Sequence, residues 1–400
     1  MTFETVDEDQ VGGRGVPALV DQVAAHRDPG SARFTIPAQP GRFVRRSRLF
    51  EGLEHGVSGP LTLVSAPAGT GKTALVSAWA TRVQARGPVA WVTLEVKDES
   101  REYFWKSFVR GLAGCGVVVP LPSEPMDAME AMEAMEAMDA MDAAGVGGSY
   151  VDAMVSGLVD RAELPGAEPV VMVLDCESDI SAEVAEDLDL VLHRSDGWLR
   201  LVVLTRVDPA LPLYRYRLAG TVVEIRLADL AFTLDEAREL MSKAGVELSA
   251  GTLQAIVDRT QGWAAGLRFL AVSLARADDP ERAALEFRGD AGDVADYLLA
   301  EVLDAQPEGG RQLLLNTSVV EVIRPGLCEA VAGPHAQRAL AVLARGNAFV
   351  HEVADSPGCY RYQPWFHDLL RAQLAYESPE RVPELHRAAA AWMADQGIVE

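Results

Sequence analysis

Short apolar runs alternate with amphipathic stretches from residue 44 to about residue 227. The runs are rich in β-branched and aliphatic residues and are typical of buried strands, whereas stretches such as 103–112 and 182–193 have helical spacing. This alternation predicts a parallel sheet with helices on both faces. The strand candidates are residues 61–65, 89–94, 170–174, 201–204 and 222–225.

Helical periodicity replaces the strand patterns after about residue 228. Thr233 as cap and Glu236 at the third helical position form a capping box, which predicts a helix start. Beyond about residue 290 the pattern stays mostly helical, with a short hairpin expected from 348–352 and 359–362. A small helical domain and then a winged-helix-like domain are therefore expected. The helices expected first are 235–244, 249–260, 263–277 and 293–305.

These patterns predict an α/β fold, with a parallel-sheet core followed by a helical lid and a winged-helix-like domain. The expected regions are a loose N-terminal arm (1–40), the sheet domain (41–228), the lid (229–288), and the winged-helix-like domain with the start of a helical region (289–400). An insertion at 121–148 contains an acidic Met/Ala repeat that runs from residue 126 to residue 143. A period of three drifts around a helix, so a surface insertion is favoured over a Met-rich recognition surface.

Composition limits the class of protein. The 400 residues suggest two to four domains, and 49% hydrophobic and 24% charged residues are ordinary for a globular protein. No stretch approaches ~18 apolar residues and the N-terminus is acidic, so neither a membrane partner nor a signal peptide is expected. The scattered cysteines fit a reducing, cytoplasmic location and argue against zinc. They are Cys115, Cys176, Cys328 and Cys359.

One segment carries recognisable chemistry. Residues 66–74 follow the strand 61–65 and lead into a helical pattern, which is a phosphate-binding loop in its required context. Its glycines let the backbone wrap a phosphate at a helix N-terminus, its lysine faces the β- and γ-phosphates, and its second threonine ligates Mg²⁺. The pattern's first glycine is an alanine here. The expected nucleotide contacts are Ala66, Pro67, Ala68, Gly69, Thr70, Gly71, Lys72, Thr73 and Ala74.

Asp175 follows the apolar strand 170–174 and is the expected second Mg²⁺ ligand, held through water. The next residue is Cys176, where many hydrolysing enzymes of this type have a second carboxylate. A thiol without a depressed pKa cannot act as a base at neutral pH, and Glu177 could substitute only if the strand end is displaced. We therefore expect binding of ATP or ADP with Mg²⁺, and weak hydrolysis or none.

Two arginines are further candidates. Arg206 follows the strand 201–204 and could deliver its guanidinium to the γ-phosphate of a triphosphate, or be a solvated strand terminus. Arg46 lies in a basic cluster before the loop, expected to contact a nucleotide or an acidic surface. With a net charge of −23, the chain is a poor DNA binder.

Several motifs, in their order and spacing, resemble one family. They are 46–50 (Arg-Ser-Arg-Leu-Phe), the loop within 61–80, 91–94 before Phe104-Trp105, 204–213, 261–267 (Gln-Gly-Trp-Ala-Ala-Gly-Leu) and 360–362. Together they resemble the signal-transduction ATPase (STAND) module of large ATP-binding LuxR-type, MalT-like transcription regulators, from about residue 42 onward. Ala66 fits the Ala/Ser-Pro-Ala-Gly form of these modules.

The resemblance implies a switch that ADP holds closed and that an inducer with ATP opens to self-associate. Related winged helices carry a Met-His-Asp motif at the ADP β-phosphate, and Phe366-His367-Asp368 is similar, so His367 is either that contact or a surface histidine. Related lids place proline near the adenine, where this chain has Ala264. MalT-like regulators continue with sensor repeats and a DNA-binding helix-turn-helix; the sequence ends at Glu400, so DNA contact is expected only through a domain absent here, in a fragment or natural short form.

Three other interpretations are compatible with the sequence. One is an ATP-hydrolysing enzyme in which Asp175, with Glu177, carries the reaction. Another is an interaction scaffold that does not need a nucleotide. Direct DNA binding by these residues is a third.

Overall fold

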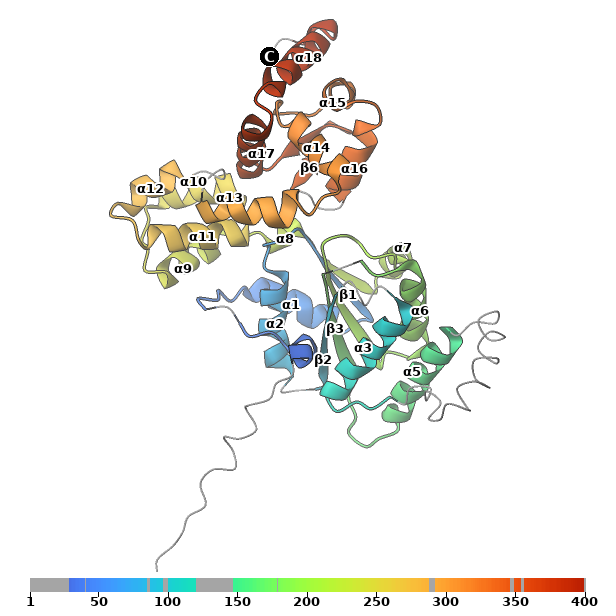
Figure 1. The fold of residues 1–400 in the computed structure, drawn as a ribbon. Helices are drawn as coiled ribbons and strands as arrows, with labels where there is room; N and C mark the ends of the chain where they lie inside the picture. Colours follow the sequence, from blue (N-terminus) through green and yellow to red (C-terminus); the bar gives the residue numbers. More distant parts are fainter. Residues whose placement is uncertain are drawn as a thin grey trace, which may run out of the picture.

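The computed structural model describes residues 29–39, 41–84, 87–95, 100–119, 147–177, 179–287, 292–345, 349–353 and 356–398. A sheet with flanking helices forms one end of the molecule, a group of helices lies beside it, and a second helical group with a small hairpin forms the other end (Figure 1). The predicted α/β fold with a helical C-terminal region is confirmed.

The sheet has five parallel strands in the order β2-β3-β4-β1-β5. Three of its strands have the predicted bounds, and the other two are longer than predicted. Since all the strands are parallel, the segments that follow β1, β3 and β4 leave the sheet at one edge. The bounds are β1 (Leu61–Ser65), β2 (Val89–Leu94), β3 (Val170–Cys176), β4 (Leu199–Thr205) and β5 (Val222–Ile225).

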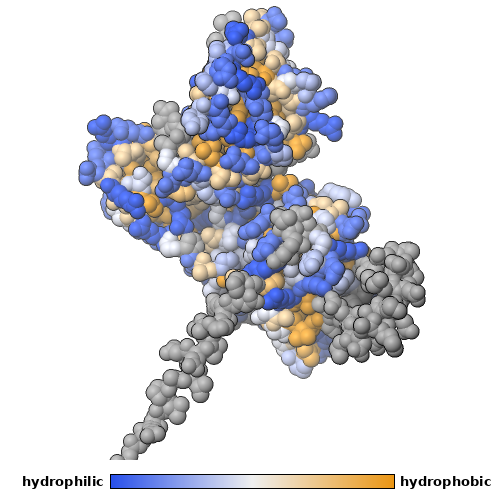
Figure 2. All heavy atoms as spheres, viewed as in Figure 1, coloured by the Kyte–Doolittle hydropathy of each residue, from blue (hydrophilic) through white to orange (hydrophobic). Residues whose placement is uncertain are grey.

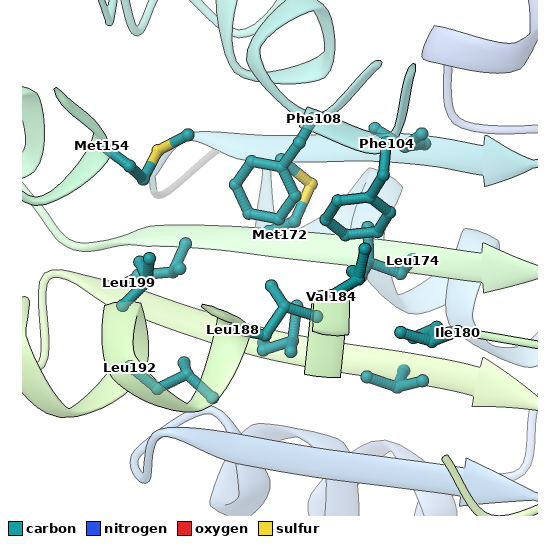
Figure 3. Packing of buried hydrophobic residues seen from close by; sticks show 14 of the residues in the cluster. Phe104, Phe108, Met154, Met172, Leu174, Ile180, Val184, Leu188, Leu192 and Leu199 are labelled. Carbon is teal, nitrogen blue, oxygen red and sulfur yellow. The ribbon is translucent and has the colours of Figure 1, made fainter. Parts of the chain in front are cut away.

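Alternate side chains of the strands enter two separate cores, one on each face of the sheet. On one face, Phe104, Met154 and Leu188 from three different helices pack over Met172 and its neighbours (Figure 3). On the opposite face, another cluster includes Val64 and Val202. The helices of the first face are α3 (Arg101–Gly114), α5 (Gly147–Ala162) and α6 (Ala182–Arg194); those of the second are α1 (Ser47–Gly56) and α2 (Lys72–Val83).

The expectation of a loose arm is wrong for part of its length. Residues Pro29–Phe34 form the 3₁₀ helix η1, which lies against β2. The ring of Phe34 packs partly buried against the sheet core, and Arg33 donates a hydrogen bond to Ser107 on α3. Partial burial of the Phe34 ring holds this segment against the sheet, because removing apolar surface from water is favourable. Residues 1–28 lie outside the described residues, and so do residues 120–146, which include the whole Met/Ala repeat.

A group of short helices follows the sheet and has its own apolar core. The capping box is present: Thr233 accepts a hydrogen bond from the Glu236 backbone, and the Glu236 carboxylate accepts one from the Thr233 N–H. The elements are α7 (Leu213–Ala219) and α8 (Leu227–Leu230) as connections, then α9 (Leu234–Lys243), α10 (Ala250–Thr260), α11 (Ala264–Leu274) and α12 (Pro280–Glu286).

The C-terminal region packs around another core, in which Phe349, Tyr362 and Phe366 are buried. The expected hairpin is present as the antiparallel pair β6–β7. On the face seen in Figure 2, hydrophilic residues cover much of this region. The elements are α13 (Gly292–Leu298), the π-helical η3 (Leu299–Leu303), α14 (Glu308–Thr317), α15 (Pro325–Ala332), α16 (Ala336–Arg345), β6 (Val350–Glu352), β7 (Tyr360–Tyr362), α17 (Pro364–Glu377) and α18 (Arg381–Asp395).

Within the described part of the chain, we find no helix with the length and apolar character that crossing a membrane requires.

Candidate nucleotide-binding site

The loop between β1 and α2 has a backbone shape that only glycine adopts readily. Gly69 and Gly71 have φ values of 71° and 84°, and Gly71 is the N-cap of α2. The Thr70 hydroxyl donates to the carbonyl oxygen of Pro67 at 2.9 Å, and the Ala66 N–H donates to Thr205 on β4 at 3.2 Å. The loop is therefore held against the sheet with the N-terminus of α2 behind it, as a phosphate site requires.

Lys72 lies over this loop. Its Nζ donates to the carbonyl oxygens of Ala66 at 2.7 Å and Pro67 at 2.9 Å. The pKa of Lys72 is lowered to about 8, mainly by burial and also by the positive charge of Arg206, while Asp175 opposes the shift. A bound phosphate would supply the negative charge that this desolvated ammonium lacks.

The two predicted metal ligands lie side by side. The Thr73 hydroxyl donates to Oδ2 of Asp175 at 3.0 Å, which joins the first turn of α2 to the end of β3. Burial raises the pKa of Asp175, while the Thr73 hydrogen bond and Lys72 oppose that shift. One hydroxyl and one carboxylate, completed by phosphate and water, form an oxygen set that suits Mg²⁺. No cluster of three His, Cys, Asp or Glu side chains suitable for a metal occurs among the described residues.

Cys176 occupies the position after Asp175, at which a hydrolysing enzyme of this type would have a second carboxylate. β3 continues through Cys176, and Asp175 stays in register opposite Thr93, so the strand end is not displaced toward Glu177. The Cys176 thiol is buried, and burial raises its pKa far above the usual range. It stays protonated at neutral pH and cannot accept a proton from water.

Arg46 and a neighbouring cavity form the other side of the loop. The Arg46 side chain is buried, donates to the carbonyl oxygen of Leu230 at 2.7 Å and lies over the Phe232 ring. Burial lowers its pKa to about 10, and Glu236 opposes this shift. Beside it lies a mostly apolar cavity of about 220 Å³. Its walls are Arg42, Phe43, Val44, Arg46, Gly69, Gly71, Ala74, Phe232, Leu240, Ala264, Ala265 and Arg268.

The start of α11 closes directly on the phosphate loop. The Ala265 N–H donates to the carbonyl oxygen of Gly69 at 2.9 Å, and the Trp263 indole N–H donates to that of Ala68 at 3.2 Å. The Trp263 ring stacks on Trp365 of α17, with centroids 4.2 Å apart and planes at 9°. A single side chain therefore touches the loop and the C-terminal region together.

Arg206 lies at the same edge of the sheet, at the end of β4. Its Nη2 donates to Oε2 of Glu301 at 2.8 Å, and its Nη1 donates to the Glu301 carbonyl oxygen at 3.3 Å. Arg206 is close enough to Lys72 to lower the pKa of that amine. The structure thus places Arg206 between the loop and η3.

His367 is engaged in its own domain. Its Nε2 lies 2.6 Å from the Ser318 carbonyl oxygen, just after α14, and its ring packs near Tyr362. These contacts tie α17 to α14 in the C-terminal core. The structure does not bring His367 into hydrogen-bonding contact with the loop.

Three kinds of site residue were not predicted from the sequence. The aromatic and aliphatic walls of the cavity, such as Phe43 and Leu240, come from segments distant along the chain. Glu301 lies in a helical run whose pattern gives no sign of its partner. Trp263 is marked in the sequence by the Gly-Trp-Ala motif, but its hydrogen bond to Ala68 depends on how the start of α11 packs against the phosphate loop.

The fold and the loop define the class: the chain has the P-loop NTPase fold. Among solved structures it resembles the Walker-type ATPase PABY2304 of Pyrococcus abyssi, with a TM-score of 0.51 and 15% identity over 84% of this chain and 98% of that chain. At this identity the likeness shows the fold alone.

Sequence comparisons find relatives among MalT-like proteins. The MalT winged helix domain family matches residues 299–382. The chain is 30% identical to serine/threonine-protein kinase PknK of Mycobacterium tuberculosis (strain ATCC 25618 / H37Rv), over 94% of this chain and 34% of PknK. It is 28% identical to HTH-type transcriptional regulator MalT of Klebsiella pneumoniae subsp. pneumoniae, over 91% of this chain and 39% of MalT. The predicted relationship to MalT-like regulators is confirmed, and the chain spans a little over a third of the length of these relatives.

Proposed function

We propose that the chain is the ATP/ADP-binding switch module of a MalT-like transcription regulator. The observation that carries this proposal is the contact of the lid with the loop backbone: Trp263 and Ala265 donate to the carbonyl oxygens of Ala68 and Gly69. A phosphate entering the loop would alter these bonds, so nucleotide occupancy and domain arrangement are physically coupled.

Each site residue has a role in this proposal. The loop N–H groups, the α2 N-terminus and Lys72 hold the β-phosphate. Thr73 and Asp175 hold Mg²⁺, which supplies charge neutralisation between the phosphates when bound. Arg46 and the apolar cavity beside Gly71 receive the nucleoside. Arg206 contacts the γ-phosphate, and His367 contacts the β-phosphate after a rearrangement that frees it from Ser318.

Hydrolysis is slow in this proposal, because Cys176 is a buried protonated thiol and Glu177 is exposed at the strand end. The site therefore serves to register which nucleotide is present, and ATP opens the module so that copies self-associate. DNA is contacted through a further domain, as the name of the MalT relative suggests. Free thiols at Cys115, Cys176, Cys328 and Cys359 support a cytoplasmic location.

The relatives support a module more than a complete enzyme. One is named a protein kinase and the other a transcriptional regulator, yet both match nearly all of this chain over little more than a third of their own length. The shared part is then a unit used with different outputs.

Nucleotide binding is the direct test. Mass spectrometry of denatured protein identifies any co-purified ADP or ATP, and titration with a fluorescent ADP analogue gives the affinity. Lys72→Ala should abolish both signals, whereas Lys106→Ala, at a half-exposed lysine on α3, should leave them unchanged. Equal binding by the parent and Lys72→Ala, or no binding by the parent, would overturn the proposal and favour the nucleotide-independent scaffold.

A further inference from the structure

An ion pair joins the sheet edge to the C-terminal region at the phosphate site. The Arg206 guanidinium directs one nitrogen to the Glu301 carboxylate and another to the Glu301 carbonyl oxygen. Glu301 thus uses both its side chain and its backbone to hold the fork of Arg206. A fork engaged at two nitrogens has little freedom left to grip a second anion.

The segment that carries Glu301 is unusual. Residues Leu299–Leu303 form a π-helical turn that directly continues α13. Such turns are rare and occur mostly as local bulges, frequently at functional sites. The bulge rotates the helix register at this point, and Glu301 on it faces Arg206. This irregularity is independent of the ion pair itself and occurs where the pair forms.

The same segment reaches the loop through a second path. Tyr297, one helical turn before Glu301, packs against Trp263 with ring centroids 5.8 Å apart. The Trp263 indole N–H in turn holds the carbonyl oxygen of Ala68 in the loop. Movement of Glu301 away from Arg206 would therefore also disturb the lid contact on the loop.

We propose that Glu301 sets the preference of the site between ATP and ADP, by competing with the γ-phosphate for the guanidinium of Arg206. This inference rests on the proposed nucleotide-binding function. In the ADP state the Glu301 carboxylate occupies Arg206 and holds η3 at the sheet edge. A γ-phosphate takes its place as the anion on Arg206, so ATP binding must break the ion pair and release η3. ADP, which lacks that phosphate, leaves the pair intact.

The exposure of the Arg206–Glu301 ion pair limits how much Glu301 can change the affinity for ATP. The Arg206 and Glu301 side chains are 43% and 44% exposed, so solvent screens the pair and its contribution is small. Removing the competitor should strengthen ATP binding by about fivefold at most, which is the upper range for exposed pairs. Added salt should shrink the difference.

The test is a thermodynamic cycle on the two nucleotides. Fluorescence titrations with Mg²⁺ would give dissociation constants of ADP and of a non-hydrolysable ATP analogue for the parent, Glu301→Gln, Arg206→Ala and the double variant. We expect Glu301→Gln to bind the ATP analogue two- to fivefold more tightly, on the order expected for an exposed pair, with ADP unchanged. Arg206→Ala should lose that preference, and adding Glu301→Gln to it should change nothing further.

A control variant and the binding of the parent distinguish a wrong role for Glu301 from a failure of the proposed nucleotide binding. Glu321→Gln removes one negative charge from an exposed site after α14 and should leave both affinities unchanged. If Glu301→Gln and Glu321→Gln give the same ratio of ATP to ADP affinity while both nucleotides bind, Glu301 is only a surface ion pair and the inference is overturned. If the parent binds neither nucleotide, the proposed function fails and takes this inference with it.

Discussion

The N–H of Ala265 and the carbonyl oxygen of Gly69 form a 2.9 Å hydrogen bond between the lid and the phosphate loop. A methyl group added at Gly69 would lie 2.8 Å from the Ala265 Cβ and 2.9 Å from the Trp263 ring, well inside normal contact. Gly69 is therefore required twice, for its positive φ and for the close approach of α11.

Gly69→Ala should displace the lid from the loop. The substitution forces an L-residue into a left-handed conformation, at a cost of about 1–2 kcal/mol, and adds the clash with Ala265 and Trp263. Gly166→Ala is the matched control, because its φ is 74° but no atom lies within 4 Å of an added Cβ. Limited proteolysis should cut Gly69→Ala faster between β5 and α11. Equal cutting of the two variants would contradict the lid contact.

The pH dependence of nucleotide binding should report on Lys72. The pKa of Lys72 in the free protein is lowered to about 8, and a phosphate needs the ammonium form. As pH rises through about 8, the free protein loses this proton, so the affinity for ADP should fall by up to tenfold per pH unit and binding should take up a proton. Calorimetry in buffers of different ionisation enthalpy measures that uptake.

The free energy of unfolding should change with pH in the opposite direction to the affinity for ADP. The unfolded chain holds the Lys72 proton up to its ordinary pKa of 10.5, whereas the folded protein releases it near 8. Between these values the unfolded state binds more protons, so the free energy of unfolding without nucleotide should rise with pH. Lys72→Arg, which stays charged, should lose both trends; if it keeps them, another group titrates.

Strands and the loop were predictable because their signals are local. The runs at 61–65, 89–94 and 222–225 each begin just after glycine or proline, and their predicted bounds match β1, β2 and β5. β4 begins earlier than predicted, at Leu199, because pairing with Val170 continues the strand past Arg200. Sequence periodicity does not contain this information about a neighbouring strand.

The site was predictable only as far as single segments carry it. Thr73 and Asp175 come together because the loop before Thr73 follows β1, Asp175 lies at the end of β3, and parallel strands end at the same edge of a sheet. Glu301 opposite Arg206, and Trp263 against Ala68, depend instead on the packing of separate domains. No spacing within either segment specifies such a contact, so both were missed.

Magnesium dependence should require Asp175. Asp175→Asn keeps the shape of the side chain beside Thr73 but removes the charge that a divalent cation needs. We expect Mg²⁺ to strengthen ATP binding to the parent and to have little effect on the variant, while affinity without Mg²⁺ changes by less than about threefold, since loop contacts remain. Thr73→Ser, which retains the hydroxyl, should behave as the parent. Full Mg²⁺ enhancement in Asp175→Asn would place the metal elsewhere.

Cys176 should be unreactive in the native protein. A thiol that cannot act as a base is expected in a nucleotide-binding switch and not in an efficient ATPase. Burial raises the pKa of its thiol far above neutrality and excludes reagents, whereas Cys359 is only partly buried. Iodoacetamide on the native protein at about pH 8 should therefore label Cys359 and spare Cys176, as peptide mass spectrometry can measure. Urea should make both cysteines reactive.

Because the Cys176 thiol cannot accept a proton, the native protein should turn over ATP at well below about 1 s⁻¹, the low end for enzymes, and alkylation should not change that rate. Rapid turnover that is abolished by Asp175→Asn would instead support the rival in which Asp175 and Glu177 carry hydrolysis, and labelling of Cys176 in the folded protein would contradict its burial.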